Sequence, residues 1–296
     1  MRRIIPFLLM LVPLGFAFAD TARVAAEADA LHDKGMYAES RKLVLDAIPG
    51  ASGGKEQAEL YWRAARETLQ LGDNAEDARK AKADILAFFT EGEGYADKAI
   101  AADPRNDLGW YWKSSNIGRW GQVKGVLDSL GKAGPMRDCL VKDLSINADR
   151  TDAYFVLGQL YREVPGWPIS FGNIDAAVSL GRKSVDLRQA QAASGAEKEF
   201  VYNFATELAK TLYKRNWSAA ARMTEQKNKA AKLASVSTPL DKGSLYEATV
   251  TLKAVSDREE AKSLVQWVVA ELGGRAALTA PQADDLKKAK EVLSGW

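Results

Sequence analysis

The stretch Tyr154-Phe155-Val156-Leu157-Gly158-Gln159-Leu160-Tyr161 decides the fold. Its two tyrosines, its first leucine and its glycine fall at positions i, i+3, i+4 and i+7, the spacing of one face of an α-helix. The stretch therefore predicts an amphipathic helix whose apolar face packs on a neighbour.

A weaker copy of this register stands upstream, with Trp110, Ser114 and Ile117 at the equivalent places. Each copy follows a helix-ending dipeptide, Asp103-Pro104 or Asn147-Ala148, whose second residue lies six positions before the leading aromatic. The shared offset indicates repetition rather than chance. The pattern is similar to the first helix of a tetratricopeptide repeat, with Tyr in the place of Trp in the second copy.

Helix signals continue almost without interruption from Thr21, and no alternating β-branched run is long enough for a sheet. We therefore predict an all-α, tetratricopeptide-like solenoid of helical hairpins over residues 20–237. The interval 104–148 exceeds the roughly 34 residues of an ordinary repeat, so the repeats are degenerate and elongated. Residues 238–296 are expected to add C-terminal helices that continue or cap the solenoid.

Several helix boundaries follow from glycine, proline and capping residues. A helix from about Ala75 to Ala102 is expected to bend or break at Gly92 and Gly94. Pro135 suits the first turn of a helix, and Asn173 is expected to cap a helix over 174–189. A further helix is expected over 245–254.

Residues 1–19 carry Arg2-Arg3, an apolar run and Ala17-Phe18-Ala19, which predict a cleaved secretory signal. The competing interpretation is an uncleaved membrane anchor, although the run is short and contains two prolines. We expect export, to the periplasm or to the cell surface, with no stable membrane insertion after cleavage. Cleavage would lower Lys+Arg from 41 to 39, equal to the 39 acidic residues, and a neutral chain lacks the footprint of a nucleic-acid binder.

The residues of a catalytic or metal centre are scarce. His32 is the only histidine and is expected on the surface, and Cys139 is the only cysteine and is expected in the core. The sequence therefore predicts no enzyme, no metal site and no cofactor. The pairs Glu259-Glu260 and Asp284-Asp285 and the lysine-rich stretch 227–232 are expected on solvated helix faces.

An insertion, Val164-Pro165-Gly166-Trp167-Pro168-Ile169-Ser170-Phe171-Gly172-Asn173, interrupts the second repeat. In one interpretation Trp167 and Phe171 fold back and plug a gap in the concave side of the solenoid. In the other the loop forms a lip over a groove, with Arg162 and Asn173 as polar anchors. The candidate ligand- or partner-binding residues are Trp110, Trp112, Trp120, Tyr154, Tyr161, Arg162, Trp167, Phe171 and Asn173.

The chain resembles the tetratricopeptide-like family that includes the T-component of TRAP transporters and the eukaryotic regulators of microtubule dynamics. The resemblance covers about residues 57–190 and rests on Tyr61–Arg66, Tyr95–Ala99, Trp110–Trp112, Tyr154–Tyr161 and Val164–Gly166. It implies an α-solenoid that binds another protein and, in the transporter branch, a hydrophobic channel for a small apolar ligand. The bacterial relatives are often lipoproteins, whereas Asp20 follows the expected cleavage site here and offers no thiol for acylation.

Two functions follow as hypotheses. The first is an exported scaffold that binds a partner protein or peptide on its concave surface without catalysis. The alternative is a T-component-like protein that handles a small hydrophobic ligand together with a periplasmic solute-binding partner.

Overall fold

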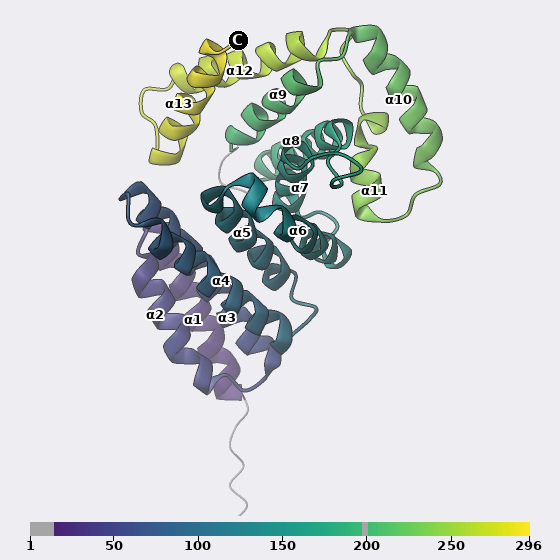
Figure 1. The fold of residues 1–296 in the computed structure, drawn as a ribbon. Helices are drawn as coiled ribbons and strands as arrows, with labels where there is room; N and C mark the ends of the chain where they lie inside the picture. Colours follow the sequence, from purple (N-terminus) through teal and green to yellow (C-terminus); the bar gives the residue numbers. More distant parts are fainter. Residues whose placement is uncertain (1–14, 197–200) are drawn as a thin grey trace, which may run out of the picture. The chain divides into compact units, whose positions relative to one another are not determined.

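The computed structural model describes residues 15–196 and 201–296, and every regular element in these ranges is helical (Figure 1). The fold is all-α, as predicted. The chain divides into two compact units, residues 1–123 and 124–296. The first unit holds α1 (Gly15–Asp33), α2 (Tyr37–Ala47), η1 (Ile48–Gly50), α3 (Gly54–Asp77), α4 (Lys82–Ala102) and α5 (Asp107–Lys124). The second holds α6 (Val126–Ile146), α7 (Thr151–Glu163), α8 (Ile174–Ser194), α9 (Asn203–Arg215), α10 (Ala219–Leu233), α11 (Pro239–Ser244), η2 (Tyr246–Thr249), α12 (Asp257–Gly273) and α13 (Ala280–Ser294).

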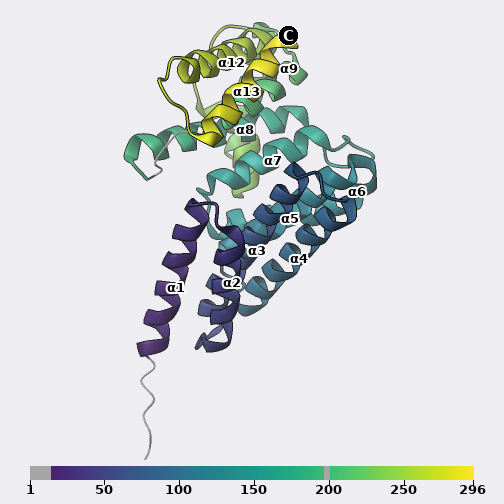
Figure 2. The same cartoon turned by 90° about the vertical axis from the view of Figure 1, so that its left-hand side faces the viewer.

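The first unit is a row of helices that lie side by side in Figure 2, with α3 and α4 packed most extensively. Gly35 turns the chain between α1 and α2 at φ +73°, a left-handed conformation that glycine adopts without a steric penalty. The packed faces bury an apolar cluster formed by Val24, Ala28, Val44, Leu60 and Ala64, and a second cluster that includes Phe89.

A buried carboxylate joins three helices of this unit. Glu67 of α3 is fully buried and accepts hydrogen bonds from Ser40 Oγ at 3.1 Å and Arg66 Nε at 2.9 Å. Its other oxygen lies 2.9 Å from His32 Nδ1. The expectation that His32 is a surface residue is therefore wrong, because the half-buried ring pairs with a buried acid.

The expected long helix from Ala75 is also wrong at its start and in its middle. The chain turns over residues 78–81, where Arg79 has φ +53°. The helix α4 then continues unbroken through Gly92 and Gly94. Gly92 faces Asn116, and the missing side chain allows that close approach.

In the second unit the hairpin of α7 and α8 closes on small residues. A Cβ at Gly158 would lie 3.2 Å from the backbone nitrogen of Gly181, so the two helices cross at near contact. Helices α9, α12 and α13 then share a core that includes Leu208, Leu212 and Val265. Asn173 caps α8 through its side-chain oxygen, as predicted.

The six-residue offset of the two repeat copies has a physical cause. Tyr154 OH donates to the carbonyl of Ala148 at 2.8 Å, and Trp110 Nε1 donates to the carbonyl of Pro104 at 3.0 Å. In each copy the leading aromatic thus satisfies a carbonyl six residues earlier, just before its helix begins.

Two other boundaries differ from the expectation. Pro135 lies inside α6 rather than at a helix start. It has no N–H to donate to the carbonyl of Gly131, and its ring crowds that carbonyl, but glycine adds no side chain to the crowding. Residues 245–254 contain the short η2 and then non-helical chain, because Glu247 turns inward to pair with Arg215 and Lys229. Cys139 is 5% exposed, as expected for a core residue.

The faces expected to be solvated are partly buried. Lys229 is 1% exposed and Asp285 is 9% exposed, where it accepts from the backbone N–H of Asn203. Glu260 lies in an ion pair with Arg182. These three corrections share one reason: each charge pairs with a group on an element distant in sequence.

The predicted signal falls mostly on residues 1–14, which lie outside the described residues. Helix α1 begins at Gly15 and runs through the expected cleavage point after residue 19. No helix in the described part is long and apolar enough to cross a membrane. Export stays a prediction, and so does the boundary at residue 238 between the solenoid and the C-terminal helices.

Candidate functional site

The segment between α7 and α8, residues 164–173, is closed at its base by backbone hydrogen bonds; we call it the α7–α8 loop. The N–H of Asn173 donates to the carbonyl of Tyr161 at 3.0 Å, and that of Gly172 to Pro165 at 2.9 Å. Gly166 and Gly172 form an isolated bridge across the base. Because both ends are pinned, the loop stands as a structured projection rather than a slack connection.

Its tip is a tight turn. The N–H groups of Ile169 and Ser170 both donate to the carbonyl of Gly166, at 3.1 and 3.2 Å. The peptide bond between Trp167 and Pro168 within this turn is cis. The turn therefore fixes the directions of the two large side chains that flank Pro168.

Gly172 is required by space. A Cβ at this position would lie 2.0 Å from the carbonyl oxygen of Val164 and 2.8 Å from Pro165 backbone atoms. Real Cβ atoms do not approach backbone this closely, so only glycine lets the two ends of the loop meet.

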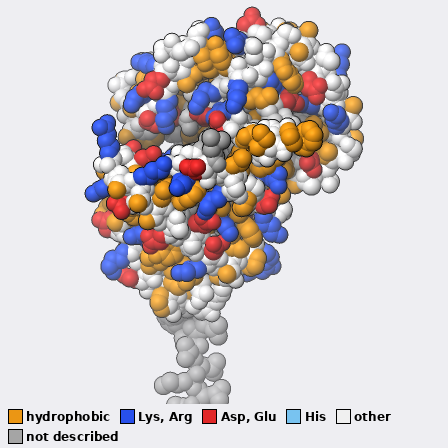
Figure 3. Space-filling model, viewed as in Figure 1, with side chains coloured by type: hydrophobic (Ala, Val, Ile, Leu, Met, Phe, Trp, Pro, Cys, Tyr) orange, Lys and Arg blue, Asp and Glu red, His pale blue; other side chains and the backbone are white. Residues whose placement is uncertain are grey.

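The tip is the most exposed apolar feature among the described residues. Trp167 is 90% exposed and Ile169 is 69% exposed, whereas no other large apolar side chain that the structure describes exceeds 39%. Figure 3 shows hydrophobic side chains gathered in a protruding patch where Figure 1 places this loop. The interpretation of Trp167 as a plug is therefore wrong, because the closed base directs the tip outward.

Phe171 does fold back. Its ring meets that of Tyr161 edge to face at a centroid distance of 5.2 Å, and the Arg137 guanidinium lies 4.4 Å from its centroid. Burial raises the pKa of Tyr161, and the charge of Arg137 opposes that rise. Arg137 could not be found from the sequence, because nothing in the pattern of α6 marks which of its charged residues reaches the loop.

The two expected polar anchors have structural roles. Arg162 is 8% exposed, and its guanidinium donates to Glu207 at 2.7 Å and to Thr211 at 3.0 Å, both in α9. The side chain of Asn173 accepts from the N–H groups of Asp175 and Ala176. Both side chains hold the helices that carry the loop, and these hydrogen bonds are made within the fold.

Tyr154 is fully buried beneath the same hairpin. Its hydroxyl accepts from Lys183 Nζ at 2.8 Å, and this ammonium lies 4.0 Å from the ring centroid. Burial raises the pKa of Tyr154 and lowers that of Lys183. Tyr154 therefore belongs to the packing between α7 and α8 rather than to the loop surface.

The three candidate tryptophans of α5 belong to the first unit. Trp112 and Trp120 pack against a buried cluster that includes Phe89. Trp110 is held by its bond to Pro104. The structure thus gathers only four of the nine candidates at one place: Tyr161, Trp167, Phe171 and Asn173.

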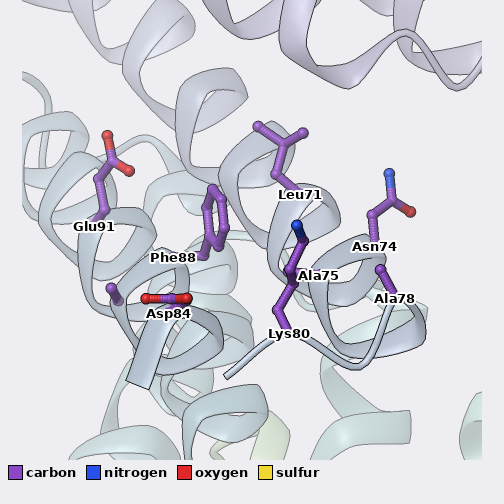
Figure 4. Close-up of a pocket in the computed structure, with 9 residues that line it drawn as sticks. Leu71, Asn74, Ala75, Ala78, Lys80, Asp84, Phe88 and Glu91 are labelled. Atoms are coloured by element: carbon purple, nitrogen blue, oxygen red, sulfur yellow. The ribbon is translucent and has the colours of Figure 1, made fainter. Parts of the chain in front are cut away.

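The first unit carries a separate hollow between α3 and α4, with a volume of about 650 Å³. We call it the α3–α4 hollow. Figure 4 shows Phe88 and Leu71 as neighbours, with Lys80 below Leu71 and with Glu91 and Asn74 on opposite sides. It is open to solvent, and its lining comprises Leu71, Asn74, Ala75, Ala78, Lys80, Asp84, Ala87, Phe88 and Glu91. Within the described residues, no three His, Cys, Asp or Glu side chains gather in a way that could hold a metal ion.

Stacked helical hairpins with a projecting loop define an all-α protein of the helical-repeat class. The sequence model of one family, regulator of microtubule dynamics protein 1-3, matches residues 24–256, and the chain belongs to that family. No curated protein is similar enough in sequence to count as a match.

Proposed function

We propose that this protein is an exported helical scaffold that binds a partner protein through the tip of the α7–α8 loop and performs no catalysis. The observation that carries the proposal is the 90% exposure of Trp167 on a loop whose base is closed. Exposing a large indole to water is costly, and tryptophan is among the residues that dominate protein interfaces.

The rigidity of the loop supports this role. A tip already fixed by the bonds to Gly166 loses little conformational entropy when a partner covers it. Phe171, Tyr161 and Arg137 brace the loop from behind, so Trp167 and Ile169 are presented as a preformed anchor pair.

The chemistry of the tip describes the partner surface. The segment from Val164 to Ile174 contains no charged residue. Binding is then carried by apolar burial, so its affinity depends only weakly on salt, unlike an interface between charged patches. The partner is expected to offer an apolar pocket deep enough for an indole.

The test uses the full chain as bait in its native host. The variant Trp167→Ala/Ile169→Ala is compared with wild type and with Met36→Ala, which removes an exposed apolar side chain (39% exposed) from the first unit. We expect one protein to co-purify with wild type and Met36→Ala and to be lost from the loop variant. Recovery of the same protein with all three baits would refute the role of the loop.

Export has a separate test. The mature protein is expected to begin at Asp20. N-terminal sequencing of protein from the periplasmic or extracellular fraction checks this, and a cytosolic chain that retains residues 1–19 would contradict it.

The α3–α4 hollow supports a second candidate function, the handling of a small hydrophobic ligand. Its volume of about 650 Å³ lies in the range of small-molecule sites, and most of its lining surface is apolar. Native mass spectrometry of gently purified protein would detect a stoichiometric ligand. Ala87→Trp, which fills the hollow, should abolish that mass shift while Trp167→Ala leaves it unchanged. A ligand that persists in Ala87→Trp would not occupy this hollow.

A further inference from the structure

Helix α10 is attached to the second unit in an unusual way. Its only buried side chains are Arg222 and Lys229, whereas the neighbouring α9 buries Phe204, Leu208 and Leu212. Figure 1 shows α10 at the edge of this unit, between α9 and α11 in the chain. A helix normally docks by burying an apolar stripe, and α10 docks by burying charge.

One face of α10 makes all of these contacts. Arg222, Gln226 and Lys229 lie at i, i+4 and i+7, so they share a face. Gln226 Nε2 donates to the carbonyls of Glu247 at 2.8 Å and Val250 at 2.6 Å. The face is therefore polar along its whole length.

The cation at the first turn reaches α12. Arg222 Nε lies 3.0 Å from Asp257 Oδ1, its guanidinium also pairs with Glu260, and it donates to the carbonyl of Val255. Asp257 is fully buried and also holds Arg215 at 2.8 Å. Arg222 thus enters a carboxylate site that already has one resident cation.

The cation at the third turn reaches α8 and η2. Lys229 Nζ donates to Asp175 at 2.6 Å, Ser179 Oγ at 2.9 Å and Glu247 at 2.8 Å. Glu247 is 2% exposed and also pairs with Arg215. All three donors of the ammonium are used.

The charges balance only while α10 is in place. The ion pairs beneath it join four carboxylates, from Asp175, Glu247, Asp257 and Glu260, to two resident guanidiniums, from Arg182 and Arg215; the carboxyl of Asp186, which also feels the charge of Arg182, is not in these pairs. The other two positive charges come from Arg222 and Lys229 of α10. Without the helix the groove, which we call the α10 groove, is left with two uncompensated negative charges.

The attachment is also exchangeable on physical grounds. Buried ion pairs gain little net free energy over the same charges in water, because desolvation offsets their attraction. A helix docked by apolar burial gains no hydration free energy when it is released, whereas each charged side chain of α10 regains its hydration. Release of α10 would leave the apolar core of α9, α12 and α13 intact.

We propose that the α10 groove is a binding site for a cationic helix of a partner protein, carrying basic residues seven positions apart, and that α10 occupies it as an internal ligand. The site lies in the second unit and uses none of the residues of the α7–α8 loop, although Asn173 at the end of that loop accepts from the N–H of Asp175.

A peptide in trans tests the site. The probe is a fluorescent synthetic peptide of residues 218–235, and its matched control carries Gln at positions 222 and 229. The host is the full chain with Arg222→Gln/Lys229→Gln, whose own α10 no longer brings cations to the groove. We expect the wild-type peptide to bind this host at least about tenfold more tightly than the control peptide does, with affinity falling as salt rises. We also expect weaker binding to the wild-type chain, where α10 competes. Equal binding of both peptides, or none to a host with wild-type circular dichroism, overturns the proposal.

If the host does not fold, hydrogen exchange on the unaltered chain tests whether α10 is released from the groove. Amides of α10 are expected to exchange at least about tenfold faster than those of α9 and α12, because α10 opens by itself. Exchange of all three helices together would show that α10 does not release, and would overturn the proposal. A dimer of the wild-type chain that the peptide dissociates would assign the groove to a second copy and overturn the assignment to a partner.

Discussion

The backbone of Gly92 in α4 touches the side chain of Asn116 in α5. A Cβ at position 92 would lie 2.1 Å from Asn116 Oδ1. Asn116 cannot move aside easily, because it is fully buried and its Nδ2 donates to the carbonyls of Trp112 at 2.9 Å and Ala65 at 3.3 Å. The pair fixes how closely α4 and α5 approach.

Replacing Gly92 by Ala should therefore destabilise the first unit. Overpacking a close helix contact costs about 1–3 kcal/mol, more than the gain in helix propensity from the same change. Urea unfolding followed by circular dichroism measures it.

Gly94, on the same helix, is the matched control for this change. Nothing lies within 4 Å of a Cβ placed there. Gly94→Ala should stabilise the protein by about 0.5–1 kcal/mol, because alanine loses less backbone entropy in a helix. If both variants shift the free energy of unfolding in the same direction, the contact with Asn116 does not determine the packing.

Gly92 shows what a sequence can and cannot reveal. A glycine inside a helical pattern has two explanations, a break or a close contact, and the second depends on a residue in another helix. A bend or break was expected at Gly92, whereas the structure has the contact. In contrast, the offset before Tyr154 was predictable, because the aromatic and the carbonyl that it satisfies lie in one short segment.

The buried charges were not predictable for a similar reason. The lysine-rich stretch 227–232 reads as solvated surface, and only the positions of Asp175 and Glu247 in space single out Lys229. The α7–α8 loop was found from its prolines, glycines and aromatics. Its outward tip was not, because that direction depends on the bridge between Gly166 and Gly172.

Gly172→Ala should open the α7–α8 loop. The new methyl group would collide with the backbone of Val164 and Pro165, which no rotamer change can relieve. We expect a loss of about 1–3 kcal/mol in the free energy of unfolding and new proteolytic cleavage within residues 164–173.

Ser170→Ala is the control in the same loop. It keeps the backbone bond from residue 170 to Gly166 and should behave as wild type. A loop that resists protease equally in both variants would show that its base does not depend on the glycine.

The stability of the second unit should fall in acid because of Glu247. Burial raises the pKa of this carboxyl, but hydrogen bonds and charge from Arg215 and the charges of Lys229 and Arg182 outweigh burial and place its pKa well below the ordinary value of 4.5. A lowered folded-state pKa contributes stability that is present above pH 4.5 and is lost as the pH falls toward the folded value. Unfolding measured from pH 7 to pH 3 should show this decline.

Glu247→Gln isolates that contribution. It should cost about 3–5 kcal/mol at pH 7, because it leaves buried cations without their partner, and it should flatten the decline below pH 4.5. The comparison is needed because Glu207 and Glu260 also have lowered pKa values and act in the same direction. Asp186 and Asp285 have raised pKa values, caused mainly by burial, and act in the opposite direction. An identical pH profile in the variant would mean that Glu247 is not the group that titrates.

Truncation of two tryptophans of the second unit should change the free energy of unfolding by very different amounts. Trp296, two residues beyond α13, stacks on Tyr213 of α9 with parallel rings at a centroid distance of 4.2 Å, and α13 itself packs against α9. Trp167 is 90% exposed. Trp296→Ala should therefore lower the free energy of unfolding by about 2 kcal/mol, from lost apolar burial and the aromatic pair, and Trp296→Phe should recover part of it. Trp167→Ala should stay within about 0.5 kcal/mol of wild type, as for a surface substitution. A large loss of stability in Trp167→Ala would show that its indole packs within the fold and is not held outward for a partner.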